Sequence, residues 1–247
     1  MNFLQKYQKE FAEYDRLDHD FIDDDKIWAL LNKWETPSRE DVRAVLKKAE
    51  QCVRLKPEET AILLQNKDEI TIQEMYELAH QLKKEVYGDR IVFFAPLYIS
   101  DECANNCVYC GFRHSNKAIQ RKTLSMDEIE QEVRIMIDEG QKRTVLVYGE
   151  SPATEVDFIC DTVKKVYSVK TEQGEIRRAN INCAPLTVKE LEKLKEAGIG
   201  TFQVFQETYH HASYRQVHPE GTIKGHYRWR LYCMDRAQQA GVDDNGI

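Results

Sequence analysis

After residue 90, short apolar runs alternate with amphipathic stretches in a regular order. The runs that predict strands lie at 90–99, 143–149, 178–186 and 201–209. The stretches that predict helices lie at 125–140, 154–168, 187–198 and 226–241. Three of these helices end at Gly140, Gly198 and Gly241, and glycine there lets the chain turn back toward a sheet. Strands that alternate with capped helices predict βα units and a parallel sheet.

The order of the βα units favours a barrel of the TIM type, although an open α/β sheet shows the same alternation. In such a barrel, ligands bind at the carboxyl ends of the strands. A last strand at 243–247 has barely begun where the sequence stops. Because a parallel barrel of about five strands leaves an open apolar edge, we expect this chain to be a piece of a longer protein, truncated within its barrel.

The residues before 90 show only helical signals, so we expect a helical layer at 1–89 in front of the barrel at 90–247. Ser38 followed by Asp41, and Thr71 followed by Glu74, are typical of helix starts, and Gly88 is typical of a helix end. Aromatic residues recur at helical spacing near the start and are expected to pack this arm on the barrel: Phe3, Tyr7, Phe11 and Tyr14.

Charge and composition narrow the class of protein. The formal net charge of -7 gives no electrostatic reason to expect nucleic acid or an anionic membrane as a partner. No run approaches the ~18 apolar residues that a membrane span needs, and the charged amino terminus does not resemble a secretory signal. We therefore expect a cytoplasmic protein. Thiols stay reduced there, so metal binding explains a tight group among the seven cysteines better than disulfides do.

Cys103, Cys107 and Cys110 directly follow the first expected strand, at the rim where a barrel carries its chemistry. A structural zinc site needs four protein ligands, and no second cysteine pair completes this one. Three thiolates on a four-iron cluster leave one iron without a protein ligand, and a reactive site needs such an open position. A zinc-binding scaffold without catalytic activity stays open as an alternative.

The spacing Cys-x3-Cys-x2-Cys, with Tyr109 before the last cysteine, resembles the radical S-adenosylmethionine (SAM) superfamily. The resemblance implies that Cys103, Cys107 and Cys110 bind a 4Fe–4S cluster and that SAM binds the open iron and is cleaved to a 5'-deoxyadenosyl radical. It also makes Tyr109 a candidate contact of the cofactors. We expect Gly111 to let the backbone turn tightly beside the cluster.

Gly149 and Glu150 follow the next expected strand, where the superfamily has a Gly-Gly-Glu-like motif. Tyr148 stands in place of the first glycine of that motif, which makes the match less complete. The resemblance implies that Glu150 accepts hydrogen bonds from the SAM amino group and that Gly149 lets the methionyl group approach the backbone.

Longer segments resemble the tyrosine lyases of this superfamily: FAPLYISDECANNCVYCGFRHSN, YGESPAT, FQETYHHASYRQVHPEG and HYRWRLYCMDRA. The likeness is to the lyases of FeFe-hydrogenase maturation (HydG) and to those of the thiamine pathway (ThiH, 2-iminoacetate synthase). Both families cleave the Cα–Cβ bond of L-tyrosine to p-cresol and dehydroglycine. The maturases carry dehydroglycine on to carbon monoxide and cyanide.

The resemblance also implies partners and a further cofactor. It implies L-tyrosine as the small-molecule substrate, an electron donor and other hydrogenase maturation proteins as partners, and neither nucleic acid nor a membrane. A maturase would carry an auxiliary iron–sulfur cluster in a C-terminal region that this chain lacks. The sequence leaves the maturase and the thiamine-pathway outcomes both open.

The expected strand 201–209 brings polar groups toward the same rim. Glu207 is a candidate to orient the ammonium group of the substrate or of SAM, although a loop ion pair would explain it equally well. Tyr209 and His210 are candidates to hold the substrate or relay protons. His211 and His218 are expected in solvated loops.

The remaining candidates are polar residues on later elements. Asn180 and Asn182 alternate onto one face of the strand at 178–186. They are candidates for the ribose or carboxylate of SAM, or they satisfy neighbouring loops. Arg230, rather than Arg228, is the candidate partner of the SAM carboxylate. The other cysteines lack companions at ligand spacing and are expected to be buried: Cys52, Cys160, Cys183 and Cys233.

Overall fold

The computed structural model describes residues 3–246. Contacts divide the chain into a helical unit, Phe21–Val92, and a sheet unit formed by Met1–Asp20 together with Phe93–Ile247. The helical unit ends close to the predicted boundary near residue 90. The predicted layer at 1–89 is nevertheless divided, because its first part packs in the sheet unit through buried aromatic side chains.

The helical unit has four helices within the described residues: α2 (Asp24–Lys33), α3 (Arg39–Glu50), α4 (Pro57–Gln65) and α5 (Glu69–Tyr87). They enclose a small core around the buried side chains of Val42, Val45 and Ile62. The predicted capping box of Ser38 and Asp41 is confirmed at the start of α3.

The start of α5 differs from the prediction. The helix begins at Glu69, and the Asp68 carboxylate accepts from the Thr71 N–H at 3.1 Å. Thr71 therefore lies inside the first turn, fully buried, and does not cap the helix. Both Asp68 and Thr71 suit a helix start, and tertiary burial of Thr71 decides between them.

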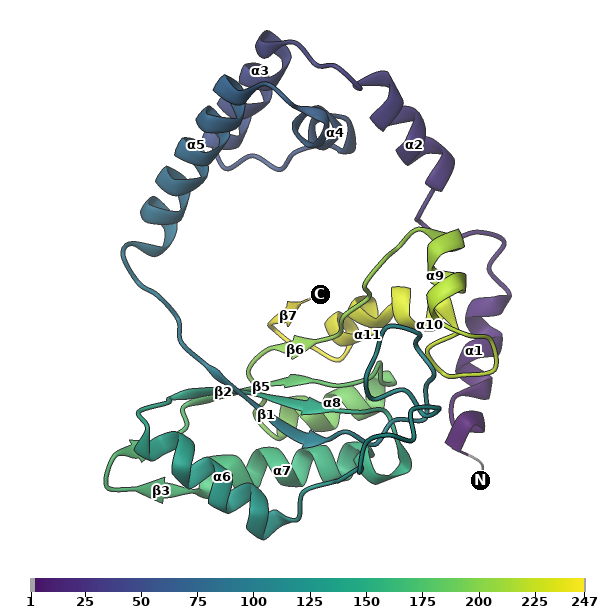
Figure 1. Ribbon diagram of the computed structural model, residues 1–247, viewed down its shortest axis with the longest axis vertical. Coiled ribbons are helices and arrows are strands. Elements are labelled where there is room, and N and C mark those ends of the chain that lie inside the picture. The colour runs from purple at the N-terminus through teal and green to yellow at the C-terminus, as the bar shows by residue number, and fades with distance from the viewer. Residues whose placement is uncertain (1–2, 247) are drawn as a thin grey trace. The chain divides into compact units, whose positions relative to one another are not determined.

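The sheet unit is built on a five-stranded parallel sheet (Figure 1). The strands are β1 (Ala95–Ser100), β2 (Arg143–Tyr148), β5 (Arg178–Asn182), β6 (Phe202–Gln203) and β7 (Asn245–Gly246), paired in that order. A small hairpin, β3 (Lys170–Thr171) and β4 (Gly174–Glu175), lies between β2 and β5 in the chain. Each new strand of the sheet joins beside the previous one, as in a barrel and unlike the reversed order of a doubly wound sheet.

Helices connect the strands and form a layer on the sheet (Figure 1). The layer consists of α6 (Met126–Asp138), α7 (Val156–Ser168), α8 (Val188–Glu196) and α11 (Cys233–Gln239). The connections also hold α9 (His211–Val217), α10 (Tyr227–Leu231) and a short 3-10 turn η2 (Pro152–Thr154). The predicted capping glycines are confirmed, because Gly140, Gly198 and Gly241 take φ values of 89°, 80° and 71°. The predicted parallel α/β fold with βα units is likewise confirmed.

The core of the sheet unit lies between the strands and this helical layer. Ile99, Leu146, Ile181 and Phe202 contribute one fully buried side chain from each of four successive strands. Burying one such side chain stabilises the fold by roughly 1.5–3 kcal/mol. The carboxyl ends of β1, β2, β5 and β6 are thereby held side by side, which fixes the loops that follow them.

Several predicted elements have different limits in the structure, among them the strand predicted at 178–186, which ends at Asn182. The first strand begins at Ala95 rather than at residue 90, because its pairing with β2 begins there, opposite Thr144. The predicted strand 201–209 is regular only at Phe202–Gln203, because β7 offers two residues for pairing. The predicted helix 226–241 is interrupted at Tyr232, between α10 and α11.

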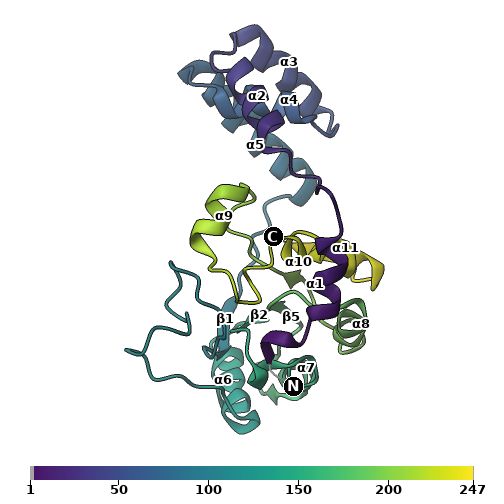
Figure 2. The same cartoon turned by 90° about the vertical axis from the view of Figure 1, so that its right-hand side faces the viewer.

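The amino-terminal arm, residues 3–20, carries a 3-10 turn η1 (Phe3–Gln5) and α1 (Gln8–Asp15), which lies beside α10 (Figure 2). Tyr7 and Phe11 are buried with Trp229 and Ile223. The rings of Tyr7 and Trp229 stack with centroids 4.8 Å apart. The prediction that these aromatic residues pack the arm on the barrel unit is confirmed.

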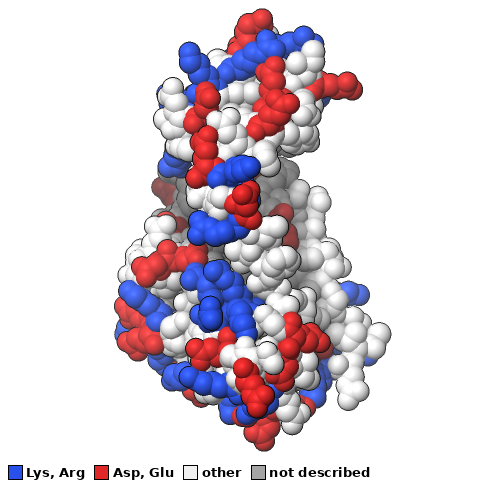
Figure 3. Space-filling model, turned by 90° about the vertical axis from the view of Figure 1, so that its left-hand side faces the viewer, with Lys and Arg blue, Asp and Glu red and all other residues white. Residues whose placement is uncertain are grey.

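Charged residues of both signs are interspersed on the face that Figure 3 shows. Among residues 3–246, none of the helices combines the length with the apolar composition that crossing a bilayer requires.

Candidate functional site

A cavity of about 160 Å³ lies at the carboxyl ends of β2, β5 and β6, and we call it the site cavity. It collects most of the predicted site residues in the sheet unit: Cys103, Cys107, Tyr109, Cys110, Gly149, Glu150, Asn182, Glu207 and Arg230. Two polar residues that were not predicted, Asn105 and Lys224, also line it. The position agrees with the rule that ligands of βα folds bind at the carboxyl ends of the strands.

The three clustered cysteines all contribute to the site cavity, with Cys107 buried and Cys103 and Cys110 partly exposed. Burial raises the pKa of the Cys103 and Cys107 thiols. Within the described chain, no three His, Cys, Asp or Glu side chains converge closely enough to hold a single metal ion. Thiolates of an iron–sulfur cluster do not share one ion, because each binds its own iron.

The loop that carries the cysteines is held by backbone contacts. The Arg121 guanidinium donates to the carbonyls of Asp101 (2.7 Å), Phe112 (2.9 Å) and Arg113 (2.6 Å). The Ala104 N–H donates to the Glu150 carbonyl at 2.7 Å and connects this loop to the end of β2. These bonds give the cysteine loop a defined conformation beside the sheet.

The two glycines predicted to matter, Gly149 and Gly111, differ in how closely other atoms approach them. A Cβ on Gly149 would lie 2.2 Å from the Glu102 carbonyl oxygen, so glycine is required there by the approach of the cysteine loop itself. Gly111 does not adopt a left-handed conformation, and an added Cβ would meet nothing within 4 Å. The expected turn is present, because the Arg113 N–H donates to the Cys110 carbonyl at 3.2 Å across Gly111, but no close contact requires glycine at this position.

Glu150 is the buried carboxylate of the site cavity, with 8% of its surface exposed. Its Oε2 accepts from Asn105 Nδ2 at 2.5 Å. Burial raises the pKa of Glu150, although Arg230 and the bond from Asn105 act in the opposite direction. Its Oε1 is buried and has no hydrogen-bond partner among residues 3–246. A ligand group that donates hydrogen bonds would satisfy this oxygen.

Two buried donor atoms complement the acceptor Glu150 Oε1. Arg230 Nε and Asn182 Nδ2 are buried and have no partner in the described chain. The other end of Arg230 is fixed, since its Nη2 donates to the Phe205 carbonyl at 2.7 Å. Arg228 instead binds the arm, through Asp20 at 3.4 Å and the Tyr14 carbonyl at 3.2 Å. The arrangement suits a ligand that carries both an ammonium group and a carboxylate, as the methionyl part of SAM does.

Glu207 follows β6 with a positive φ of 61°, which is uncommon for a residue other than glycine. Its carboxylate binds Lys224 Nζ at 2.7 Å and lies 3.6 Å from His218 Nε2. Burial opposes its ionisation, but bonds to His218 and Lys224 outweigh burial and lower the pKa of Glu207 to about 2. Glu207 is therefore both an ion-pair partner, as the alternative proposed, and a lining residue of the site cavity.

The prediction that His218 lies in a solvated loop is wrong, because only 1% of it is exposed. Its Nε2 contacts the Tyr109 hydroxyl at 2.8 Å, and its Nδ1 contacts the Tyr214 carbonyl at 3.1 Å. His211 is half-buried and lies 3.1 Å from Asp20. Tyr109, which precedes the last cysteine of the loop, is thus hydrogen-bonded to His218 at the end of α9.

The structure does not bring every predicted residue to the site cavity. His210 binds Ser213 through Nδ1 at 2.9 Å, and the Tyr209 carbonyl accepts from Tyr227 at 2.7 Å. Asn180 accepts from the Thr201 N–H at 2.9 Å and so satisfies a neighbouring loop. These residues do not belong to the lining of the site cavity in the described chain.

The four isolated cysteines divide into two groups. Cys160, Cys183 and Cys233 are buried as predicted. The prediction for Cys52 is wrong, because it is exposed in a turn after α3 with a φ of 54°. Cys183 follows β5 and is also part of the site-cavity lining.

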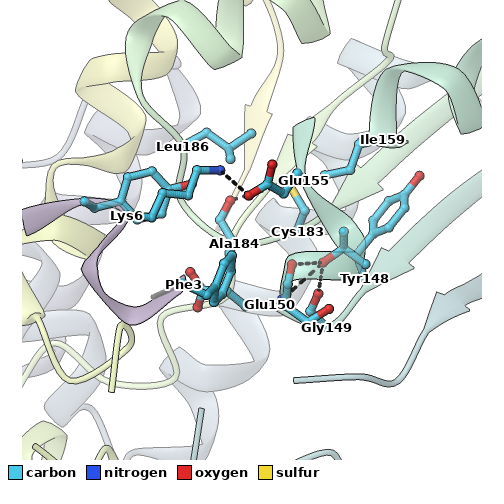
Figure 4. A pocket seen from close by; sticks show the side chains of 13 residues that line it. Phe3, Lys6, Tyr148, Gly149, Glu150, Glu155, Ile159, Cys183, Ala184 and Leu186 are labelled. Carbon is cyan, nitrogen blue, oxygen red and sulfur yellow. Dashed lines mark hydrogen bonds and ion pairs between the residues drawn. The ribbon is translucent and has the colours of Figure 1, made fainter. Parts of the chain in front are cut away.

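A second, much smaller cavity of about 20 Å³ also borders Glu150 (Figure 4). Phe3, Lys6 and Tyr7 of the arm form one side of it. Lys6 is held there by Glu190 at 2.8 Å. A cavity of this size has room for about one water molecule, so the arm closes one side of the Glu150 environment.

Comparison with known proteins agrees with this geometry. A family model described as the radical SAM superfamily matches residues 97–247. The chain is 35% identical over 176 residues to 2-iminoacetate synthase of Escherichia coli (strain K12), an alignment that covers 71% of this chain and 45% of that protein. It is 31% identical over 230 residues to 2-iminoacetate synthase of Salmonella typhimurium, covering 88% of this chain and 58% of that protein.

Solved structures show the same relationship. The crystal structure of HydG, a maturase of the [FeFe]-hydrogenase, superposes with a TM-score of 0.88 at 45% identity, covering 92% of this chain and 50% of that one. HydG from Carboxydothermus hydrogenoformans gives a TM-score of 0.79 at 36% identity, covering 97% and 53%. This chain thus spans about half the length of these relatives.

Radical SAM proteins use a 4Fe–4S cluster and SAM, and the three cysteines and the unpartnered polar atoms of the site cavity fit these two groups. From its sequence match, its sheet and its site cavity, the chain belongs to the radical SAM superfamily and is similar to the HydG and 2-iminoacetate synthase proteins within it.

Proposed function

We propose that this chain forms the cofactor-binding part of a lyase that cleaves the Cα–Cβ bond of L-tyrosine to p-cresol and dehydroglycine. The observation that carries the proposal is the site cavity, in which three cysteines lie with an unpartnered buried carboxylate oxygen and two unpartnered buried donors. The choice of tyrosine rests on the similarity to HydG and 2-iminoacetate synthase.

The residues of the site cavity have distinct tasks in this proposal. Cys103, Cys107 and Cys110 hold the cluster, and Glu150 Oε1 accepts from the ammonium group of SAM. Arg230 Nε donates to the SAM carboxylate, and Asn182 Nδ2 donates to another acceptor of SAM. When bound, the cluster and SAM supply one-electron radical chemistry, and the protein positions the reactants and excludes water.

Glu207 also lines the site cavity. We propose that it orients a bound group from there, because Lys224 and His218 keep its carboxylate ionised and in place. Tyr209 and His210 lie on the chain segment that follows, and both take part in contacts outside the cavity. We propose that they act when substrate is bound.

Within the tyrosine lyases, we propose the hydrogenase-maturing type. The 45% identity to the HydG structure over 92% of this chain exceeds the 35% identity to 2-iminoacetate synthase over 71%. In this proposal dehydroglycine is converted further to carbon monoxide and cyanide by a region with an auxiliary iron–sulfur cluster, and other maturation proteins and a cytoplasmic electron donor are the partners.

The test is an anaerobic incubation of the complete protein with SAM, dithionite and L-tyrosine, followed by mass analysis and an assay for carbon monoxide. p-Cresol together with carbon monoxide supports the maturase, whereas p-cresol alone supports the thiamine-pathway lyase. Absence of p-cresol with an intact cluster overturns the assignment of tyrosine. A protein that stays colourless near ~400 nm after iron–sulfide reconstitution points to the zinc scaffold, because zinc is d¹⁰.

A further inference from the structure

Asn105 lies between the first two cysteines of the loop and connects three parts of the site. It is 3% exposed. Its side-chain Nδ2 donates to Glu150 Oε2 at 2.5 Å, and its Oδ1 accepts from the Lys224 backbone N–H at 2.8 Å. Its own carbonyl accepts from the His114 N–H at 2.7 Å. One buried side chain thus joins the cysteine loop, the end of β2 and the turn that carries Lys224.

The chemistry of the two partners fixes which way the Asn105 amide points. A backbone N–H can only donate, so the atom that faces Lys224 must be the amide oxygen. With the oxygen facing Lys224, the other atom of the amide, its nitrogen, faces Glu150 and donates to Oε2. A flipped amide would lose both bonds in a buried environment, which would cost more than either bond contributes when made.

The bond from Asn105 makes the two oxygens of Glu150 unequal. Oε2 accepts the hydrogen bond from Asn105, whereas Oε1 is buried and has no partner among the described residues. Without Asn105, the carboxylate could rotate about its terminal torsion, which is broad in glutamate. A carboxylate that is already oriented does not have to be ordered when a ligand arrives, and this raises affinity.

We propose that Asn105 is a positioning residue that occupies Oε2 of Glu150 and thereby reserves Oε1 for the ammonium group of bound SAM. The proposal rests on the assignment of SAM to the site cavity, but it does not depend on which substrate is cleaved. Asn105 acts through Glu150, and its Nδ2 also lies 3.8 Å from Cys103 Sγ.

The chain offers a matched control beside it. Asn106 is the next residue of the same loop, is half-buried, and its Oδ1 accepts from the Ser115 N–H at 2.9 Å. Asn106→Ala therefore removes one side-chain amide and one loop hydrogen bond without touching Glu150. Asn105→Ala removes an amide of the same size together with its bonds to Glu150 and to the Lys224 N–H.

The experiment measures the Kd of SAM by equilibrium dialysis on the reconstituted complete protein, with iron content determined in parallel and no tyrosine present. We expect Asn105→Ala to raise the Kd about 10- to 100-fold, the range typical of partners that orient a ligating group, at wild-type iron content. We expect Asn106→Ala to leave both quantities unchanged. Wild-type affinity in Asn105→Ala, or loss of iron from it, overturns the proposal.

A double-mutant cycle distinguishes positioning from a general role in folding. In the Glu150→Gln background, Asn105→Ala should add little to the Kd, because its effect passes through Glu150. If the two effects are additive, Asn105 acts elsewhere and the proposal is wrong. Since no tyrosine is used, a failure of tyrosine cleavage would contradict the proposed function and leave this result unaffected.

Discussion

The two units of the chain differ in the charged side chains that they bury. In the helical unit the charges pair at the surface, as Arg39 does with Asp68 and Arg43 with Glu74, each at 2.7 Å. In the sheet unit Glu150 and Arg230 are buried, and each retains an atom without a partner in the described chain. Exposed pairs contribute little to stability, whereas a buried polar atom without a partner costs about 1–3 kcal/mol. That cost points to ligand binding in the sheet unit and to a structural role for the paired charges of the helical unit.

The largest effect should come from the cysteine loop of the sheet unit. Cys107→Ala removes one of the three cysteines that we propose as cluster ligands, so we expect formation of 5'-deoxyadenosine to be abolished and the bound iron to fall sharply, while the far-UV circular dichroism stays unchanged. The helical unit provides the control: Cys52 is exposed, and Cys52→Ala should keep full iron content. Normal turnover in Cys107→Ala would contradict the cluster assignment.

Glu150→Ala should have the next largest effect. It removes the buried carboxylate that we propose as the partner of the SAM ammonium group, so we expect SAM affinity to fall about 30-fold or more, which corresponds to about 2 kcal/mol. Iron content should remain at the wild-type level, because Glu150 is not a cluster ligand. Glu74→Ala, in the helical unit, should leave SAM affinity unchanged. An unaltered Kd in Glu150→Ala would remove Glu150 from the site.

Val42→Ala should have the reverse effect of Glu150→Ala. It should lower the stability of the helical unit and leave the affinity for SAM unchanged. Val42 is fully buried in the core of the helical unit. Removing its two methyl groups should lower the free energy of unfolding of this unit by about 2 kcal/mol, measured by urea titration. Val53 is 47% exposed, and Val53→Ala should change this free energy of unfolding by less than about 0.5 kcal/mol. A reduced affinity for SAM in Val42→Ala would show that the two units are coupled.

The parts of the site that sequence reasoning found are those with local signals. The three cysteines lie within eight positions of the sequence, and Gly149 and Glu150 directly follow a strand that the apolar pattern predicts. Helix caps at Ser38 and the glycines after α6 and α8 are also local, and they were predicted correctly. Spacing along the chain is sufficient to predict a site or a helix cap when its residues are neighbours in the sequence.

The residues that were missed depend on contacts between distant parts of the chain. Asn105 meets Glu150 across 45 positions and Lys224 across 119. His218 meets Tyr109 across 109 positions, so its burial has no counterpart in the local pattern around it. The limits of β6 likewise depend on how much of β7 is available for pairing. Such features follow from tertiary packing, which a single sequence does not reveal.

The smallest effect should come from the surface pair of Arg43 and Glu74 in the helical unit. The hydrogen bond from Arg43 lowers the pKa of Glu74 below its ordinary value of 4.5 in the folded protein. The pair therefore contributes its stabilisation fully above that ordinary value, and the contribution is lost as the pH falls through the lowered pKa. Arg43→Gln should shift the urea midpoint only slightly at pH 7 and by less still at high salt, because solvent and ions screen exposed charges. The difference from wild type should disappear in acid. A difference in urea midpoint that persisted at low pH would mean that Arg43 stabilises the unit by packing its aliphatic stem rather than by its charge. The two units would then differ only in whether their charged side chains are buried.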